Sequence, residues 1–252
     1  MIVGSAAKVA PKDGYTLLVS TGGPMSINPS VYKDKLTYDP IKDFIPIAPV
    51  VKAPLLLYCN VDLPVKNVNE MVAYVKARRG QISYGSGGVG TTQHLSMEML
   101  KKVTGMEMTH VPYRGSPMVI QDVIGGQIPF AFDAGGSLLP QMRSGRVRVI
   151  AVTSPQRYPA LPDVPTFVEQ GLPSINSQVW MGLFAPVGTP SHIVARLDAA
   201  VTQAASAPEF ARSLANAGAA PWLGSSDDLR RFLAADIARW AVIVKAAGVQ
   251  PD

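Results

Sequence analysis

The chain has 252 residues, of which 47% are hydrophobic and 16% charged, and its formal net charge is +5. This apolar fraction excludes a disordered chain, and the length is enough for one or two domains that bury their own cores. The single cysteine excludes an internal disulfide framework and a cysteine-cluster metal site, and three widely spaced histidines offer little for a zinc site. The composition therefore predicts a globular protein without a bound metal.

The excess positive charge lies mostly in the middle of the chain, in three short clusters: Lys76-Ala77-Arg78-Arg79, Lys101-Lys102 and Arg143 to Arg148. Each cluster ends a predicted helix, where cations interact favourably with the helix dipole. A nucleic-acid interface favours one basic stripe interleaved with exposed aromatic residues. We therefore expect no nucleic-acid partner.

Apolar stretches are too short to cross a membrane. The longest, Ala53 to Val61 and Trp180 to Val187, fall well below the roughly 18 residues that a spanning helix needs. The first residues carry neither the basic region nor the apolar region of a secretion signal.

The middle of the chain alternates predicted strands and helices. Asn67 and Glu70 have the spacing of a capping box, and Ser116-Pro117 is typical of a helix start. This alternation of strands and helices predicts a parallel sheet with right-handed crossovers. The expected strands are 82–84, 108–112, 128–132 and 147–153, and the expected helices follow Asn67, the glycine-rich loop 85–90, Ser116 and Gly135.

The two flanks of the chain have a different pattern. Tyr15 to Thr21 is an apolar strand, and two helices are expected after Thr189-Pro190 and from Ser225 to Gly248. Two apolar extended runs, 54–60 and 178–185, stand on either side of the regular middle. We interpret these runs as a two-strand hinge between two α/β lobes, lobe 1 formed by 1–53 plus 179–252 and lobe 2 by 54–178.

The most specific local motif is the glycine-rich loop, which follows a strand and opens a helix. It matches the spacing of a dinucleotide-binding fingerprint, and Arg114 stands where a 2′-phosphate partner would. The same loop also fits a carboxylate nest, because free backbone N–H groups at a helix N-terminus bind anions. A tight turn that binds nothing is the third interpretation. We favour the carboxylate nest. The loop reads Gly85-Ser86-Gly87-Gly88-Val89-Gly90-Thr91-Thr92.

Two further residues have both a functional and a structural interpretation. Asp133 follows an apolar strand at the expected carboxyl edge of the sheet, where it would accept a hydrogen bond from a ligand or act as the N-cap of the next helix. His94 stands in the first turn of a helix, and a packing role is favoured. No serine, cysteine or zinc-protease motif accompanies them.

A set of short motifs is distributed along nearly the whole chain. They are Asp13-Gly14-Tyr15-Thr16-Leu17-Leu18, Ile27-Asn28-Pro29, Asp43-Phe44-Ile45-Pro46-Ile47, Tyr84 to Leu95, His110-Val111-Pro112-Tyr113-Arg114-Gly115-Ser116, Gly126-Gln127-Ile128, Leu161-Pro162-Asp163-Val164-Pro165-Thr166 and Ala185-Pro186-Val187-Gly188-Thr189-Pro190. In combination these motifs resemble the Bug-type substrate-binding proteins of tripartite tricarboxylate transporters.

The resemblance implies an α/β periplasmic-binding fold whose two doubly wound lobes close on a small carboxylate. It also implies a periplasmic location, delivery to a membrane permease, a monomer, no cofactor and no catalysis. The alternative is an NAD(P)-binding oxidoreductase of the Rossmann type. The predicted ligand-binding residues are Ser86, Gly87, Gly88, Gly90, Thr91 and Thr92 in lobe 2, Thr21 and Gly22 on the opposite lip in lobe 1, and Asp133 for a second polar group of the ligand.

The start of the chain departs from the family pattern. Family members carry a signal peptide and a strand–loop–helix–strand unit before the Asp-Gly-Tyr-Thr motif, which here begins at Asp13. The resemblance therefore predicts that lobe 1 lacks its opening unit and one of its ligand-binding loops. It further predicts that lobe 1 is the less stable lobe and that the chain binds ligand weakly or not at all.

Overall fold

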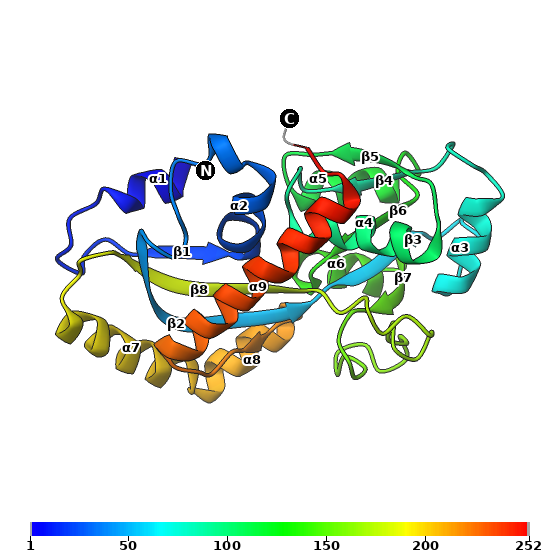
Figure 1. Ribbon diagram of the computed structural model, residues 1–252. Helices are drawn as coiled ribbons and strands as arrows, with labels where there is room; N and C mark the ends of the chain where they lie inside the picture. Colours follow the sequence, from blue (N-terminus) through cyan, green and yellow to red (C-terminus); the bar gives the residue numbers. More distant parts are fainter. Residues whose placement is uncertain (1, 251–252) are drawn as a thin grey trace. The chain divides into compact units, whose positions relative to one another are not determined.

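The computed structural model describes residues 2–250 and divides the chain into two compact units (Figure 1). Unit 1 contains 1–52, 180–214 and 220–252, and unit 2 contains 53–179 and 215–219. The segment 215–219, which was expected in lobe 1, packs with unit 2. One contact of this segment is very close, since a Cβ on Gly135 would lie 2.8 Å from the Cα of Gly218.

Unit 2 is built on a five-stranded sheet with the order β5-β4-β6-β3-β7. Its strands are β3 (Leu56–Asn60), β4 (Ser83–Ser86), β5 (Thr109–Pro112), β6 (Phe130–Asp133) and β7 (Val147–Val152). Its helices are α3 (Val68–Lys76), α4 (Thr92–Thr104), α5 (Ser116–Ile124) and α6 (Gly135–Arg143).

The sheet of unit 2 is mixed: the four strands expected from the strand–helix alternation run parallel to one another, and β3, from the run 54–60 interpreted as a hinge strand, joins them antiparallel. Strand β4 pairs in parallel with β5 and β6, as the strand–helix rhythm predicts. Strand β3, however, pairs antiparallel with both β6 and β7. The rhythm does not determine its direction, because β3 enters from unit 1 rather than from a crossover helix within unit 2.

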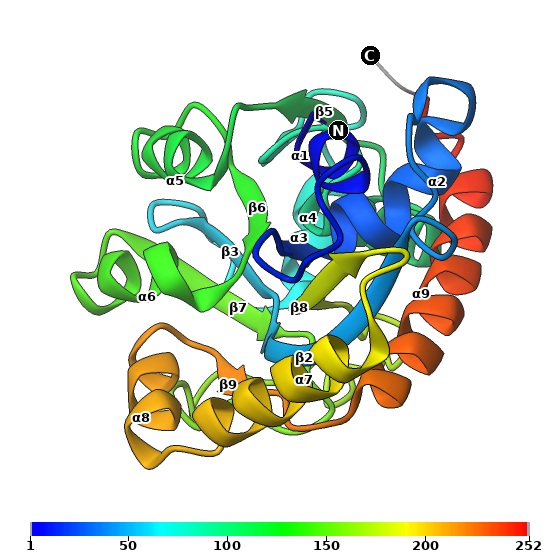
Figure 2. The ribbon, with the colours of Figure 1, turned by 90° about the vertical axis from the view of Figure 1, so that its left-hand side faces the viewer.

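Helices cover both faces of this sheet, and each face has its own apolar core. Met71 and Val75 of α3 and Met97 and Leu100 of α4 pack on one face. Helices α5 and α6 pack on the other face, where Figure 2 shows them side by side. Both faces are therefore buried, as expected for an α/β unit.

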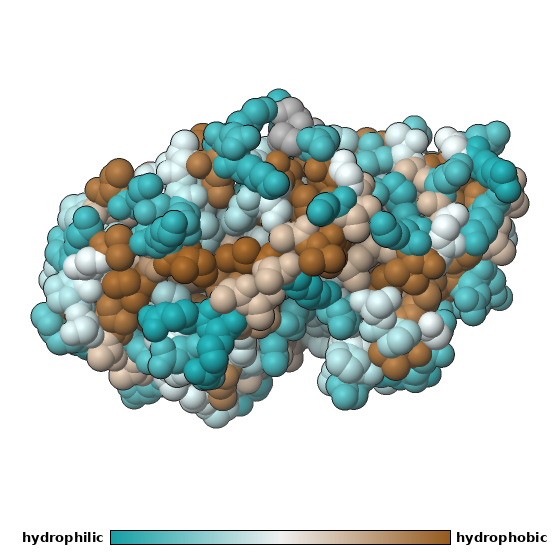
Figure 3. All heavy atoms as spheres, viewed as in Figure 1, coloured by the Kyte–Doolittle hydropathy of each residue, from teal (hydrophilic) through white to brown (hydrophobic). Residues whose placement is uncertain are grey.

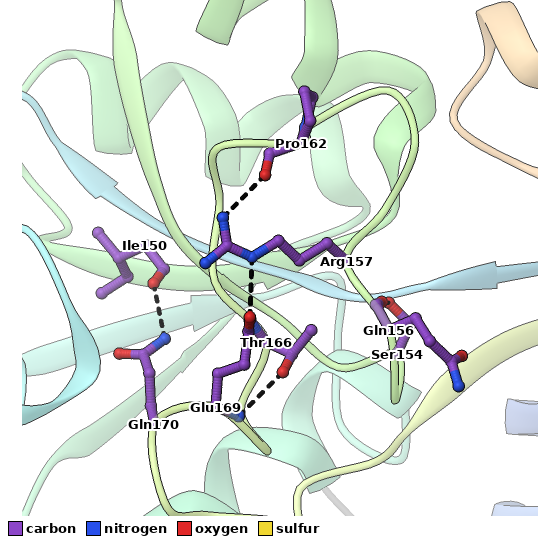
Figure 4. Close-up of polar contacts among 8 residues, drawn as sticks. All are labelled: Ile150, Ser154, Gln156, Arg157, Pro162, Thr166, Glu169 and Gln170. Atoms are coloured by element: carbon purple, nitrogen blue, oxygen red, sulfur yellow. Dashed lines mark hydrogen bonds and ion pairs between the residues drawn. The ribbon is translucent and has the colours of Figure 1, made fainter.

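A long segment without helix or strand joins β7 to β8 (Gln178–Pro186) and is held by polar contacts (Figure 4). Arg157 forms an ion pair with Glu169 at 2.9 Å and also donates to the carbonyl oxygen of Pro162 at 3.0 Å. Gln170 donates to the carbonyl oxygen of Ile150 in β7 at 3.1 Å. The motif Leu161 to Thr166 thus forms part of a loop that is fixed on unit 2.

Unit 1 contains a four-stranded sheet with the order β1-β8-β2-β9. Its strands are β1 (Leu18–Thr21), β2 (Phe44–Pro54), β8 and β9 (Ala220–Pro221). Its helices are α1 (Ile2–Lys8), the π-helix η1 (Gly23–Ile27), α2 (Asn28–Val31), the 3-10 helix η2 (Lys33–Lys35), α7 (Ser191–Ala205), α8 (Pro208–Asn216) and α9 (Ser226–Ala247).

Helix α9 begins and ends where the sequence predicts. Ser225 and Asp228 form a reciprocal capping box, and Gly248 caps the other end in the left-handed conformation. Its apolar side packs into the core of unit 1, where Leu229 and Leu233 are fully buried together with Trp180. Burial of this face, rather than helix propensity alone, stabilises the helix.

Strand β1 is shorter than the predicted strand 15–21 and lies at the edge of its sheet. It pairs antiparallel with β8. Val19 in β1 is 62% exposed and Tyr15 before it is 93% exposed. Figure 3 shows apolar atoms gathered over β1 and β8 on the face in view. An exposed apolar edge of this kind favours self-association.

Candidate functional site

The glycine-rich loop lies at the point in unit 2 where the chain changes direction along the sheet. Strand β4 leads through α4 to β5 on one side, and β5 leads through α5 to β6 on the other. Helices α4 and α5 pack on opposite faces of the sheet. The carboxyl end of β4 is therefore a topological switch point, the position at which open α/β sheets bind ligands.

Hydrogen bonds inside the loop define its shape. The hydroxyl of Ser86 contacts the carbonyl oxygen of Gly88 at 3.0 Å and accepts from the Gly88 N–H at 3.2 Å. It also lies 2.7 Å from Nε2 of His110. Because a hydroxyl has one proton and Ser86 is 1% exposed, this side chain is committed to the loop. The structure thus gives Ser86 a structural role, and its predicted side-chain contact with a ligand gains no support.

The two threonines at the start of α4 differ in whether the protein already uses their hydroxyl groups. Thr91 is the N-cap: its hydroxyl donates to the Gly88 carbonyl oxygen at 2.8 Å and accepts from the His94 N–H at 3.3 Å. Thr92 has no side-chain hydrogen bond among the described residues. The N–H groups of Thr92 and Gln93, in the first turn, also lack partners within the described chain. The donors without a partner at this helix start are therefore the hydroxyl of Thr92, a residue that is 6% exposed, and the first two N–H groups of α4.

Stacked aromatic rings lie next to the glycine-rich loop. The ring centroids of His94 and His110 lie 3.8 Å apart with 9° between their planes, and Tyr84 stacks on His110 at 5.0 Å. Nδ1 of His94 accepts from the Gly90 N–H at 3.4 Å. Burial lowers the pKa of His94 to about 3, with smaller contributions from His110 and Lys101. His94 is therefore a neutral packing residue, as the sequence favoured, and its pairing with His110 was not visible in the sequence.

Asp133 ends β6, the neighbour of β4, and is 5% exposed. The structure contradicts its alternative role as an N-cap, because Ala134 occupies that position of α6. Oδ1 of Asp133 accepts from the Ala134 N–H at 2.7 Å. Burial raises the pKa of Asp133 to about 6, although Ser116, the Ala134 N–H and Gln93 each act to lower it. Three helix starts therefore meet at this carboxyl group.

The remaining predicted residues, Thr21 and Gly22, lie in unit 1 at the end of β1 and the start of η1. A Cβ on Gly22 would lie only 2.9 Å from Nε1 of Trp180, whose N–H donates to Asp236 at 3.0 Å. Packing against this buried tryptophan is thus one reason for a glycine here. The predicted contact of Thr21 and Gly22 with a ligand stays a prediction.

The geometry of unit 2 favours binding over catalysis. Within residues 2–250, histidine, cysteine and acidic side chains form no group of three able to hold a metal. The Ser86–His110 pair is not an activated nucleophile, because the hydroxyl is buried and engaged by Gly88. The fold and this site define an α/β solute-binding protein of the periplasmic type.

The family model described as "Tripartite tricarboxylate transporter family receptor" matches residues 1–249. The chain belongs to this family, whose members are periplasmic solute receptors and not enzymes. The alternative prediction of an NAD(P)-dependent oxidoreductase is therefore wrong. The fingerprint spacing alone does not separate the two interpretations, because an anion-binding loop and a dinucleotide-binding loop both place glycines before a helix start.

Similar proteins include a UPF0065 protein of Bordetella pertussis, 35% identical over 243 residues that cover 96% of this chain and 75% of the relative. Among solved structures, R. palustris Rpa4515 with adipate has a TM-score of 0.94 and 35% identity, covering 100% of this chain and 84% of that one. MatC of Rhodopseudomonas palustris with bound malate has a TM-score of 0.88 and 31% identity, with coverage of 96% and 83%. The predicted fold class is thereby confirmed. None of the helices in residues 2–250 is long and apolar enough to span a membrane.

Proposed function

We propose that this receptor captures a small organic carboxylate outside the cytoplasm for the membrane subunits of a tripartite tricarboxylate transporter. The observation that carries the proposal is the set of unpartnered donors at the start of α4, located at the switch point of unit 2. The adipate and malate bound by two similar proteins support a carboxylate as the ligand. Backbone donors recognise the carboxylate group itself, whereas its carbon skeleton is recognised elsewhere.

Gly87 is the residue of the loop whose identity is best explained by a ligand. A Cβ at this position would meet its nearest neighbour at 3.5 Å, an ordinary contact, and the residue does not have a positive φ. Neither packing nor backbone conformation therefore requires a glycine there. By contrast, a Cβ on Gly85 would lie 2.6 Å from a methyl group of Val119. We infer that Gly87 leaves room for the ligand carboxylate to approach the backbone.

The test is titration calorimetry of the chain with succinate, adipate, L-malate, L-aspartate and benzoate. The proposal requires that at least one acid binds, even if only weakly, and that Gly87→Ala weakens that binding by about tenfold or more, equivalent to about 1.4 kcal/mol. Gly125→Ala is the matched control, because Gly125 has an ordinary φ of −75° at the far end of α5. Failure of every acid to bind, or unchanged affinity in Gly87→Ala, would contradict the proposal.

A second variant addresses unit 1. If Thr21 contributes to the ligand site as the family resemblance predicts, Thr21→Val weakens binding of the same acid while the unfolding of unit 2 is unchanged. Circular dichroism on heating checks that the variant is folded. Unaltered affinity would remove Thr21 from the site and leave the loop of unit 2 as the remaining candidate.

A further inference from the structure

Two buried polar atoms on neighbouring strands of unit 2 have no hydrogen-bond partner within residues 2–250: Oη of Tyr58 and Oδ2 of Asp133. Tyr58 is fully buried and Asp133 is 5% exposed. Leaving a buried polar atom without a partner destabilises a folded protein. Two such atoms in one place therefore need an explanation.

Both side chains lie on the same face of the sheet. In the antiparallel pair of β3 and β6, Tyr58 is opposite Ala131 and Leu56 is opposite Asp133. Tyr58 and Asp133 are thus diagonal neighbours, with a separation of about 7–8 Å that an aromatic side chain can span. The charge of Asp133 also contributes, after burial, to a raised pKa of Tyr58, which is consistent with this proximity.

Tyr58 has apolar neighbours, whereas the neighbours of Asp133 are polar. Tyr58 packs with Val119 of α5 and Leu138 of α6 in the core of this face. The groups that act on the Asp133 carboxyl group are Ser116, the Ala134 N–H and Gln93, and no cation is among them. Ser116 and Gln93 lie close enough to lower the pKa of this carboxyl group, but neither reaches Oδ2 with hydrogen-bond geometry, and Oδ2 has no other donor within the described chain.

We propose that Tyr58 and Asp133 form a donor-selective subsite that accepts a hydroxyl or ammonium group of the bound carboxylate. This inference rests on the proposed function and specifies its ligand class: an organic acid that carries a hydroxyl or amino group on its carbon skeleton. Asp133 Oδ2 accepts from that group, and the Tyr58 hydroxyl either donates to it or accepts from it. An unsubstituted acid leaves both protein atoms without a partner, which is the condition under which polar sites discriminate strongly.

The experiment compares matched acids that differ in this one group. Calorimetry at pH 7.5 measures the affinities of the chain for L-malate, L-aspartate and succinate. The unmodified chain prefers at least one substituted acid over succinate by about tenfold or more. Asp133→Asn reduces this preference to about threefold or less, and Tyr58→Phe reduces it in the same direction.

Control variants separate selectivity from folding. Tyr158→Phe changes a tyrosine that packs against the same core, and Asp163→Asn changes an exposed carboxylate. Both retain the preference of the unmodified chain. Because each measurement is a ratio of two affinities in one variant, a general loss of stability affects both acids alike and leaves the ratio unchanged.

The outcomes separate this inference from the proposed function. Binding of succinate and the substituted acids with equal affinity would overturn the subsite and leave a carboxylate receptor. A preference that survives both Asp133→Asn and Tyr58→Phe would also overturn it and assign the two orphan atoms to a structural water. If no acid of either kind binds, the proposed function fails and the subsite fails with it.

Discussion

The imidazole rings of His94 and His110 stack with their centroids 3.8 Å apart, and both rings contact the glycine-rich loop, His94 at Gly90 and His110 at Ser86. A positive charge on the His94 ring would be buried away from water and would lie against the His110 ring. This explains why burial, together with His110 and Lys101, lowers the pKa of His94 to about 3. The loop is therefore supported by a residue that remains neutral over the physiological range of pH.

This pKa predicts a pH dependence of the stability of unit 2. The unfolded chain protonates His94 near its ordinary pKa of 6.5, whereas the folded chain does so only near 3. Between these values the unfolded state binds more protons, so acidification lowers the free energy of unfolding by up to about 1.4 kcal/mol per pH unit. Because Asp133 contributes an opposite slope between 3.8 and about 6, the His94 contribution is measured as the difference between the unmodified chain and His94→Phe, by native-state hydrogen exchange of the β4 amides between pH 4 and 7.

His94→Phe keeps an aromatic ring in the stack and removes the titrating group. The slope of stability against pH in unit 2 therefore decreases by about one proton in this variant. The absolute stability also decreases, because the Gly90 N–H loses its acceptor. His192→Phe in α7 of unit 1 is the control. If His94→Phe has the same slope as the unmodified chain, the assignment of the slope to His94 is contradicted.

Asp133 predicts the opposite dependence. The folded chain protonates this carboxyl group at about 6 and the unfolded chain at 3.8, so the folded state binds more protons between these values. The favourable contribution is present below 3.8 and is lost as the pH rises through 6. Asp133→Asn therefore stabilises unit 2 at pH 7.5, by up to about 3 kcal/mol, and has little effect at pH 3.5. Thermal unfolding at both pH values checks this, and destabilisation at pH 7.5 would contradict it.

The two threonines of α4 give a matched pair of variants. Thr91→Val removes the helix cap and the bond to Gly88, so unit 2 loses about 1–2 kcal/mol of stability. Thr92→Val removes a hydroxyl with no partner among the described residues, so stability changes little while ligand affinity decreases several-fold. Denaturation and calorimetry on both proteins distinguish the roles. Equal effects of the two substitutions on stability would refute the distinction.

The exposed edge of unit 1 predicts self-association. Val19→Lys places a charge on the edge strand β1 and reduces association at high protein concentration, because charged edge strands pair poorly with other chains. Val242→Lys in α9 is the control, since Val242 is 69% exposed but belongs to a helix. Light scattering over a concentration series measures the effect. A decrease as large in Val242→Lys as in Val19→Lys would show that the edge is not the cause.

Local signals in the sequence determined the helix ends and the position of the glycine-rich loop. Asn67 caps the start of α3 and Gly248 the end of α9 as predicted, because capping depends on residues a few positions apart. One start shifted by a residue: Gly115 rather than Ser116 is the N-cap of α5. Motifs spread along the chain were enough to recognise the family, since their combination is far more specific than any one of them.

Only the tertiary structure decided which side chains become neighbours in unit 2. His94 is brought to His110, and Tyr58 to Asp133, by strand pairing and helix packing between segments that are distant in sequence. The antiparallel direction of β3 was equally invisible, because hydrophobic periodicity reports which face is buried but not which way a strand runs. The sequence also did not show that the hydroxyls of Ser86 and Thr91, two predicted ligand-binding residues, bond to the carbonyl oxygen of Gly88. A sequence shows that a donor is present, and only folding shows whether the protein already uses it.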